Sequence, residues 1–247
     1  KQSCVQLTWP HENTDWRDYL NEADECFYNI AGEIVKREKL IIVCEDIERV
    51  KHITKSLDQS KIIYCEIENN DTWARDHGGI TVFDDNRPII LNYQFNGWGM
   101  KFPANKDNQI TRKLQEIGVF SSKVVLEHHK EFVLEGGSIE SDGLGTILTT
   151  SRCLLSYNRN EYLTKEQIVD KLKKELGAER VLFLEHGYLE GDDTDSHIDT
   201  LARFCDPHTI CYVKSYDEKD VHFSELSMME EELKKLCDIN GNPYNLV

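Results

Sequence analysis

Apolar side chains recur along this chain with two periods, and each period predicts one kind of element. Short apolar or alternating runs predict strands at residues 2–9, 39–44, 61–67, 80–83, 88–95, 123–127, 180–184 and 209–213, and a hairpin over 138–156. Apolar residues three and four positions apart predict helices at residues 15–38, 47–57, 109–117, 164–176 and 224–236. The order repeats strand, strand, helix, strand, which predicts an α/β fold.

Single residues predict where some of these elements end. Asp15 and Thr164 are suited to cap the helices that they precede, and Gly177 is suited to end the helix before it. The chain contains no glycine-rich phosphate loop and no low-complexity linker. We therefore expect residues 1–247 to form a single domain.

The charge of the chain restricts its partners. It has 247 residues, of which 45 are acidic and 29 basic, for a net charge of −16. This excess argues against nucleic acids and anionic membranes and suits a small cationic substrate, while a homo-oligomer is left open.

Cysteine usage predicts a reducing compartment. None of the eight cysteines forms a CxxC pair, and four lie in apolar runs typical of strands: Cys44, Cys65, Cys153 and Cys211. We expect these thiols to act as small apolar side chains in a cytoplasmic protein, since no run reaches membrane-spanning length and no secretory leader is recognisable.

The stretch GDDTDSHID is the richest in possible chemistry, because it places four carboxylates around one histidine. If it is a strand, His197 and Asp199 point to the same face. An imidazole can move a proton near neutral pH, and a carboxylate beside it can bind a cation or stabilise the imidazolium. A solvated polar turn explains the same residues equally well.

Two further acidic positions follow predicted strands. Asp76 lies in NNDTWARDHGG, and Glu135 directly precedes two glycines. Two carboxylates that face one planar cation can accept paired N–H bonds, which predicts a guanidino compound as ligand. A divalent metal is the competing ligand, because Asp and His also coordinate zinc or manganese; the spacing is not that of an EF-hand, and we expect no metal site.

Three more residues are candidates for contact with such a cation. Trp73 and Trp98 can flank a flat cation or serve as packing anchors. Asp193 can receive a second amine or remain a solvated turn residue.

Several long motifs resemble agmatine deiminases, within the wider peptidylarginine-deiminase-like family: TWPHENTDW, NDTWARDHGG, FNGWGMKFPANKDNQ, LEGGSIESDG, LLSYNRN and GDDTDSHIDTLARF. The resemblance implies a pentein fold, an α/β propeller of repeated strand–strand–helix–strand blades around a central site. It also implies hydrolysis of agmatine to N-carbamoylputrescine and ammonia through a cysteine thiouronium, without a cofactor. In this likeness Asp76 and Asp199 hold the guanidinium, His197 is the general acid/base, and Glu135 supports histidine and substrate. The four are expected to converge on one cleft.

The chain departs from that family in one respect. The family nucleophile lies in a Gly/His/Cys motif near the C-terminus, and residues 1–247 contain no such motif. We therefore interpret the chain as truncated and inactive by itself, since Cys205 and Cys211 lie among apolar strand-like residues. A deiminase of arginine or peptidyl-arginine and a non-catalytic guanidine-binding protein remain as alternatives.

Overall fold

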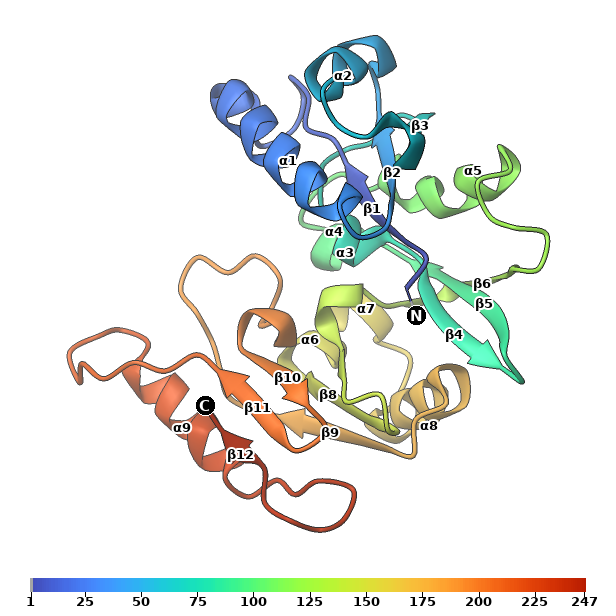
Figure 1. Ribbon diagram of the computed structural model, residues 1–247. Coiled ribbons are helices and arrows are strands. Elements are labelled where there is room, and N and C mark those ends of the chain that lie inside the picture. The colour runs from blue at the N-terminus through green and yellow to red at the C-terminus, as the bar shows by residue number, and fades with distance from the viewer. Residues whose placement is uncertain (1) are drawn as a thin grey trace. The chain divides into compact units, whose positions relative to one another are not determined.

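The computed structural model describes residues 2–247, which form two compact units (Figure 1). Unit 1 comprises the chain up to Phe95 together with Pro103–His129, and unit 2 comprises Asn96–Phe102 and Lys130–Val247. Each unit has its own sheets and its own apolar core, and each is described by itself. That residues 1–247 form a single domain stays a prediction.

Unit 1 begins with a parallel sheet of strand order β1-β2-β3. Its elements are β1 (Cys4–Thr8), α1 (Leu20–Val35), β2 (Lys39–Cys44), α2 (Ile47–Thr54), the 3-10 turn η2 (Gln59–Lys61) and β3 (Ile62–Glu66). The helices provide the crossovers that parallel strands need. Leu40 and Ile42 of β2 face the α1 and α2 side of the core, whereas Ile41 and Val43 belong to a second apolar cluster with Ile110. The predicted strands and the helix after residue 47 are confirmed here.

The first predicted helix begins later than its periodicity indicated. A short 3-10 turn, η1 (Arg17–Tyr19), precedes α1, which begins at Leu20 rather than Asp15. The backbone N–H of Asp15 donates to Asp71, and the Trp16 indole N–H donates to Thr72. These contacts hold residues 15 and 16 against a distant loop, so the prediction that Asp15 caps the helix was wrong.

The rest of unit 1 is built around a hairpin that extends into a sheet of order β4-β5-β6. The elements are α3 (Ala74–His77), β4 (Ile80–Asp84), β5 (Arg87–Gln94), η3 (Asp107–Gln109), α5 (Ile110–Glu116) and β6 (Val125–Val133), which leads along the chain into unit 2. Asp85 and Asn86 have φ angles of 45° and 65°, as a two-residue hairpin turn requires. The strands predicted at 80–83 and 88–95 are confirmed as the two arms of this hairpin, and the strand predicted at 123–127 continues to Val133.

Unit 2 repeats one arrangement twice. Its elements are α4 (Gly97–Met100), η4 (Gly136–Ser138), β7 (Glu140–Ser141), β8 (Thr146–Thr150), α6 (Ser151–Leu154), α7 (Tyr157–Asn160), α8 (Lys165–Leu176), β9 (Arg180–Leu184), η5 (Ile198–Thr200), β10 (Ala202–Asp206), β11 (Thr209–Tyr212), α9 (Phe223–Leu233) and β12 (Asn245–Leu246). In each sheet an antiparallel pair is followed by a helix and a parallel third strand: β7-β8-α8-β9, then β10-β11-α9-β12. Leu148, Leu184 and Ile210 from both sheets share one core with Met229 of α9. The predicted order of strand, strand, helix, strand is confirmed in both sheets.

Local signals located α8 of unit 2, but they misplaced the end of one hairpin and the burial of one cysteine. Thr164 caps α8 in a full capping box, and Gly177 ends it at φ 68°, both as predicted. The predicted hairpin over 138–156 stops at Thr150, because the Thr150 side chain accepts a hydrogen bond from Cys153 and begins α6. Cys211 is exposed on β11, so its expected burial was wrong.

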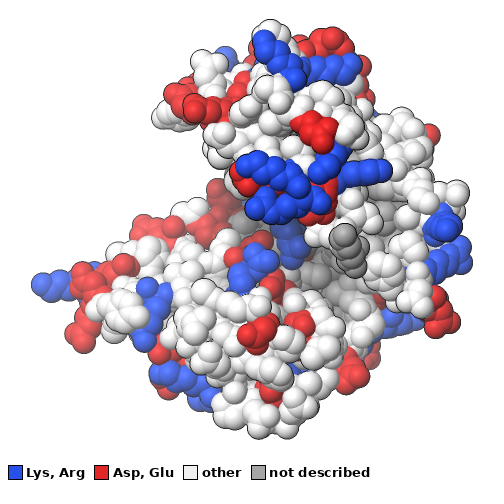
Figure 2. Space-filling view, viewed as in Figure 1, with Lys and Arg blue, Asp and Glu red and all other residues white. Residues whose placement is uncertain are grey.

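Acidic and basic side chains are interspersed on the face shown in Figure 2, although acidic residues are in excess over the whole chain. No helix among residues 2–247 is long and apolar enough to cross a membrane.

Candidate active site

The loop before β10 is shaped by its own polar side chains. Asp192 accepts hydrogen bonds from the backbone N–H groups of Thr194 and Ser196, and the Thr194 hydroxyl accepts one from the backbone of His197 at 3.0 Å. Asp195 and Ser196 both have φ 64°, in the left-handed region. The loop therefore folds back on itself instead of extending as a strand.

This geometry corrects the predicted strand. His197 immediately precedes η5, and Asp199 lies within that 3-10 turn. The two side chains are not related by strand alternation, and the period-two argument for them was wrong. Their exposure also differs, because His197 is fully buried and Asp199 only partly.

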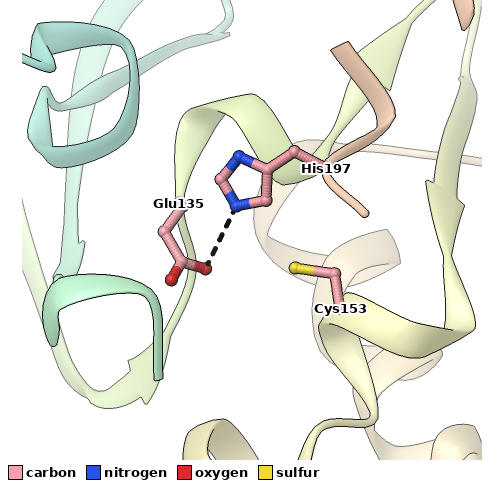
Figure 3. Close-up of side chains that lie close together, drawn as sticks. All are labelled: Glu135, Cys153 and His197. Carbon is pink, nitrogen blue, oxygen red and sulfur yellow. Dashed lines mark ion pairs between the residues drawn. The ribbon is translucent and has the colours of Figure 1, made fainter. Parts of the chain in front are cut away.

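A carboxylate from another loop reaches His197. Glu135 follows β6, and the Ser138 backbone and hydroxyl both donate to its carbonyl oxygen, which closes η4 beneath it. Its Oε2 lies 4.0 Å from Nε2 of His197, and both side chains are buried (Figure 3). Glu135 and His197 thus form a buried carboxylate–imidazole pair.

Cys153 completes a group of three potential ligands. It lies on α6, and its sulfur, a carboxylate oxygen of Glu135 and a ring nitrogen of His197 all lie within 4.8 Å of one another (Figure 3). The Thr150 hydroxyl at the start of α6 donates to the Ser196 carbonyl at 2.7 Å, which ties this helix to the loop of His197. The sequence reading of Cys153 as buried is confirmed, but its assignment to a strand was wrong.

Arg159 of α7 is in direct contact with the pair. Its Nε donates to Oε1 and Oε2 of Glu135 at 3.1 and 3.0 Å, and its Nη1 donates to Oδ2 of Asp195 at 2.7 Å. Its Nη2 donates to the Thr194 carbonyl at 2.9 Å. The guanidinium side chain has no exposed surface. Asp195 also pairs with Lys101 at 2.7 Å, so the charges form a chain of alternating sign.

These contacts determine the charge states. Burial raises the pKa of the Glu135 carboxyl, and the Arg159 guanidinium opposes that rise. Burial and then the positive charge of Arg159 lower the pKa of His197 to about 3. Burial opposes ionisation of Asp195, but hydrogen bonds from Lys101 and Arg159 outweigh it and lower that pKa. The imidazole is therefore neutral at physiological pH and able to accept a proton.

The oxygen, sulfur and nitrogen donors of Glu135, Cys153 and His197 are the types that zinc prefers. Both oxygens of Glu135 already accept from Arg159, whose charge repels a second cation at the same place. This arrangement fits proton transfer better than metal binding.

The remaining predicted residues of unit 2 have other surroundings. Trp98 is buried with φ 56° and packs edge-on against Phe102, with ring centroids 5.7 Å apart. Asp193 is exposed, and its carbonyl accepts a hydrogen bond from Lys101. Contact of Trp98 or Asp193 with a ligand stays a prediction.

Asp76 and Trp73 belong to unit 1. Asp76 is buried in α3, beside the buried His77, whose pKa burial lowers to about 4. Trp73 is 41% exposed and lies against Trp16, with ring centroids 6.0 Å apart. Convergence of Asp76 with the residues of unit 2 stays a prediction.

The sequence did not point to three residues that lie at this site: Cys153, Arg159 and Asp195. Arg159 lies in the LLSYNRN motif and Asp195 in GDDTDSHID, so both were inside segments already singled out. Which arginine would meet which carboxylate depends on long-range packing and carries no local signal.

Mixed three-stranded sheets with a buried carboxylate–imidazole pair define an α/β protein with a site suited to proton transfer. The chain belongs to the family of Porphyromonas-type peptidyl-arginine deiminases, whose family model matches residues 1–247.

Individual relatives agree with this assignment. An agmatine deiminase from Stutzerimonas stutzeri is 33% identical over 97% of this chain and 65% of its own length. A structure described as a "putative arginine deiminase" from Porphyromonas gingivalis is 52% identical, with a TM-score of 0.93 over 100% of this chain and 73% of that one. A cysteine-to-serine variant of agmatine deiminase from C. jejuni with its substrate bound is 37% identical, with a TM-score of 0.91 over 100% and 70%. The chain thus spans about two thirds of the length of such curated relatives.

Proposed function

We propose that the full-length protein hydrolyses the guanidinium group of agmatine to N-carbamoylputrescine and ammonia. The observation that carries the chemistry is the buried Glu135–His197 pair, in which a neutral imidazole lies beside a carboxylate. The choice of agmatine is supported by relatives named agmatine deiminase and by the likeness to the substrate-bound structure from C. jejuni. The net charge of −16 suits a doubly cationic substrate.

The proposal includes a pentein architecture for the full-length protein. Its support is the repeat in unit 2, where two successive sheets share the order antiparallel pair, helix, parallel strand. Such units are the blades of the proposed propeller. A cytoplasmic location is also part of the proposal, because buried thiols such as Cys44 and Cys65 suit a reducing compartment.

The proposed reaction uses a cysteine thiolate outside residues 1–247 as nucleophile. His197 accepts the thiol proton, and the sulfur forms a bond to the guanidinium carbon. The imidazolium returns that proton to the leaving nitrogen, the C–N bond breaks and ammonia departs. Water then gives a proton to His197 and adds to the thiouronium carbon. Cleavage of the C–S bond releases the thiolate and, after loss of a proton, the ureido product.

Other residues have binding roles in this proposal. Asp76 and Asp199 accept N–H bonds from the guanidinium and fix its plane. Glu135 stabilises the imidazolium of His197. Trp73 and Trp98 are proposed contacts of the flat cation, and Asp193 that of the far amine.

Arginine or peptidyl-arginine is the second candidate substrate, because the structure from Porphyromonas gingivalis at 52% identity is described as a "putative arginine deiminase". The test is ammonia release by the full-length protein from agmatine, free arginine and an arginine-containing peptide. We expect the largest kcat/KM with agmatine. A larger kcat/KM with arginine or the peptide would support the second candidate substrate instead. If no guanidino compound is turned over, the protein would be a non-catalytic guanidine-binding protein.

The guanidinium role of Asp199 has its own variant test. Asp199→Asn keeps the size but presents an amide donor to the substrate N–H, and it removes a neutralising charge. We expect a loss of at least about a hundredfold in kcat/KM, since each 1.4 kcal/mol is roughly tenfold and each defect is worth on the order of a few kcal/mol. His197→Ala should abolish turnover.

Asp193→Asn is the matched control, because Asp193 is exposed on the loop before His197. With substrates that lack the far amine it should retain nearly the parental kcat/KM. Near-parental kcat/KM in Asp199→Asn would show that Asp199 does not hold the guanidinium.

A further inference from the structure

We propose that Arg159 is a positioning residue of this site, whose guanidinium holds the Glu135 carboxylate beside His197 and joins it to the loop that carries His197. The inference rests on the proposed function, in which Glu135 and His197 act together. The hydrogen bonds of the Arg159 guanidinium run to Glu135, Asp195 and Thr194, so its effect is exerted through these residues.

The geometry uses the whole fork of the guanidinium. Nε faces both oxygens of Glu135, Nη1 faces Asp195, and Nη2 faces the Thr194 carbonyl, all between 2.7 and 3.1 Å. A planar fork can meet a carboxylate on one side and a second acceptor pair on the other, whereas a lysine ammonium is a single point charge. Lysine at this position could satisfy one carboxylate but not both loops at once.

The residues flanking Arg159 hold further segments. The Asn158 carbonyl accepts from the Asn96 side chain at 2.9 Å, at the start of α4. The Asn160 side chain donates to the Val133 carbonyl at 2.9 Å and accepts from its N–H at 3.0 Å, two residues before Glu135. The three residues of the NRN motif therefore bind three different parts of unit 2.

The α4 loop approaches this motif closely. Gly99 has φ 80°, and a Cβ added there would lie 3.3 Å from Cβ of Asn158 and 3.4 Å from Nη1 of Arg159. Lys101, which follows α4, pairs with Asp195 from the other side. The loop thus packs against the Arg159 side chain, which has no exposed surface, while the Asp195 side chain remains 24% exposed.

Burial explains why this contact matters for Glu135. An ionised carboxylate without exposed surface is costly unless it is paired and hydrogen-bonded. Without Arg159, Glu135 would bind a proton or turn away, and it could no longer stabilise an imidazolium on His197. The groups that face the pair are Arg159 from α7, Cys153 from α6, Asp192 and Asp195 from the loop, and Lys101 after α4.

The test uses Arg159→Met and Arg159→Lys in the full-length protein. For Arg159→Met we expect kcat to fall at least about a hundredfold while KM changes less than about threefold, since positioning acts on the chemical step. The acid limb of the kcat/KM profile should move to higher pH, because the remaining Glu135–His197 pair holds a proton more tightly. In Arg159→Lys the acid limb of the kcat/KM profile should lie at its parental pH, but kcat should recover only in part.

Arg152→Met is the matched control. Arg152 is an exposed arginine on α6 that stacks on Tyr188 with its guanidinium carbon 4.3 Å from the ring centroid, and it makes no described contact with Glu135. It should leave kcat, KM and the pH profile at parental values. A parental kcat in Arg159→Lys would show that the planar guanidinium is not required. A parental kcat and pH profile in a folded Arg159→Met would contradict the proposal altogether.

Two readouts distinguish a failure of the positioning role of Arg159 from a failure of the proposed function. If Arg159→Met does not fold, Arg159→Lys with a parental thermal midpoint decides through kcat: a reduced kcat supports the proposal and a parental kcat contradicts it. If the parental protein turns over no guanidino substrate, the proposed function fails, but the His197 titration by NMR still tests the positioning. An upward shift of that titration in Arg159→Met supports the proposal and an unchanged titration contradicts it, while Arg159→Lys should titrate as the parental protein does.

Discussion

At the scale of single residues, His197 shows how burial selects one charge state. Its ring has almost no contact with water, and the neighbouring Arg159 adds positive charge. The carboxylates of Asp192 and Asp195 act in the opposite direction but do not compensate for lost hydration. The resting imidazole is consequently neutral, which is the state in which it would accept the thiol proton in the proposed reaction.

This charge state can be measured. Because burial lowers the pKa of His197 to about 3, its ring nitrogens should show a neutral tautomer from neutral pH down to about pH 4 in the NMR spectrum. His197→Gln identifies the resonance by its loss. Titration near the ordinary value of 6.5 would contradict the proposed environment.

The same shift affects folding stability. Between pH 6.5 and about 3 the unfolded histidine binds a proton that the folded one does not. The contribution of neutral His197 is therefore fully present above pH 6.5 and is lost as pH falls towards 3. In His197→Gln this part of the acid dependence of the free energy of unfolding should disappear.

At the scale of elements, the loop before α3 is held by a reciprocal contact between Asn70 and Asp107. The Asp107 carboxylate accepts from the backbone of Asn70 at 2.6 Å and of Asp71 at 3.2 Å, while the Asn70 side chain accepts from the backbone of Lys106 at 2.7 Å. This contact joins the NDTWARD and NKDN segments. It fixes the position of the loop that leads to Asp76.

Asp107→Ala should destabilise unit 1 by about 1–3 kcal/mol, because it leaves the partly buried backbone donors of Asn70 and Asp71 without their acceptor. Asp107→Asn, the closer control, retains an acceptor oxygen and should cost less. Urea unfolding measures both, and hydrogen exchange of residues 69–77 shows whether the loss is local. Parental stability and exchange in Asp107→Ala would show that the contact does not hold the loop.

The pH dependence of these variants has a defined sign. Burial raises the pKa of Asp107 to about 7, against the opposing backbone hydrogen bonds. The folded state then binds a proton that the unfolded state releases above its ordinary value of 3.8. Stability from this group is full below that value and is lost as pH rises to about 7, and Asp107→Asn should remove that slope.

At the scale of the whole molecule, the excess of acidic residues favours encounter with cations. Acidic and basic side chains are mixed on the face shown in Figure 2, so we attribute the attraction to the net charge of −16. Such long-range attraction is screened by salt.

We therefore expect kcat/KM for agmatine to fall several-fold when ionic strength rises from about 0.01 M to about 0.15 M, as the Debye length shortens from about 30 Å to about 8 Å. Agmatine acylated on its far amine carries one positive charge fewer and is the matched control. Its kcat/KM should fall less steeply. Equal slopes for the two substrates would show that net charge does not steer binding.

The sequence by itself determined most of the elements and several loops that carry chemistry. Apolar periodicity located β2, β9 and α8, because strands and helices are specified by residues a few positions apart. The capping box at Thr164 and the turn at Asp85 and Asn86 are local in the same sense. The motifs around Glu135 and His197 contain the two residues that form the buried pair, and the family that they resemble is the one to which the chain belongs.

Only the tertiary structure decided how those segments meet. The loop of His197 turns back through Asp192 instead of extending, and α1 begins late because Asp15 is held by Asp71. Arg159 meets a carboxylate 24 residues before it and another 36 residues after it. Such pairs depend on long-range packing, which sets the burial and charge around His197 and hence its protonation. No local pattern encodes that environment.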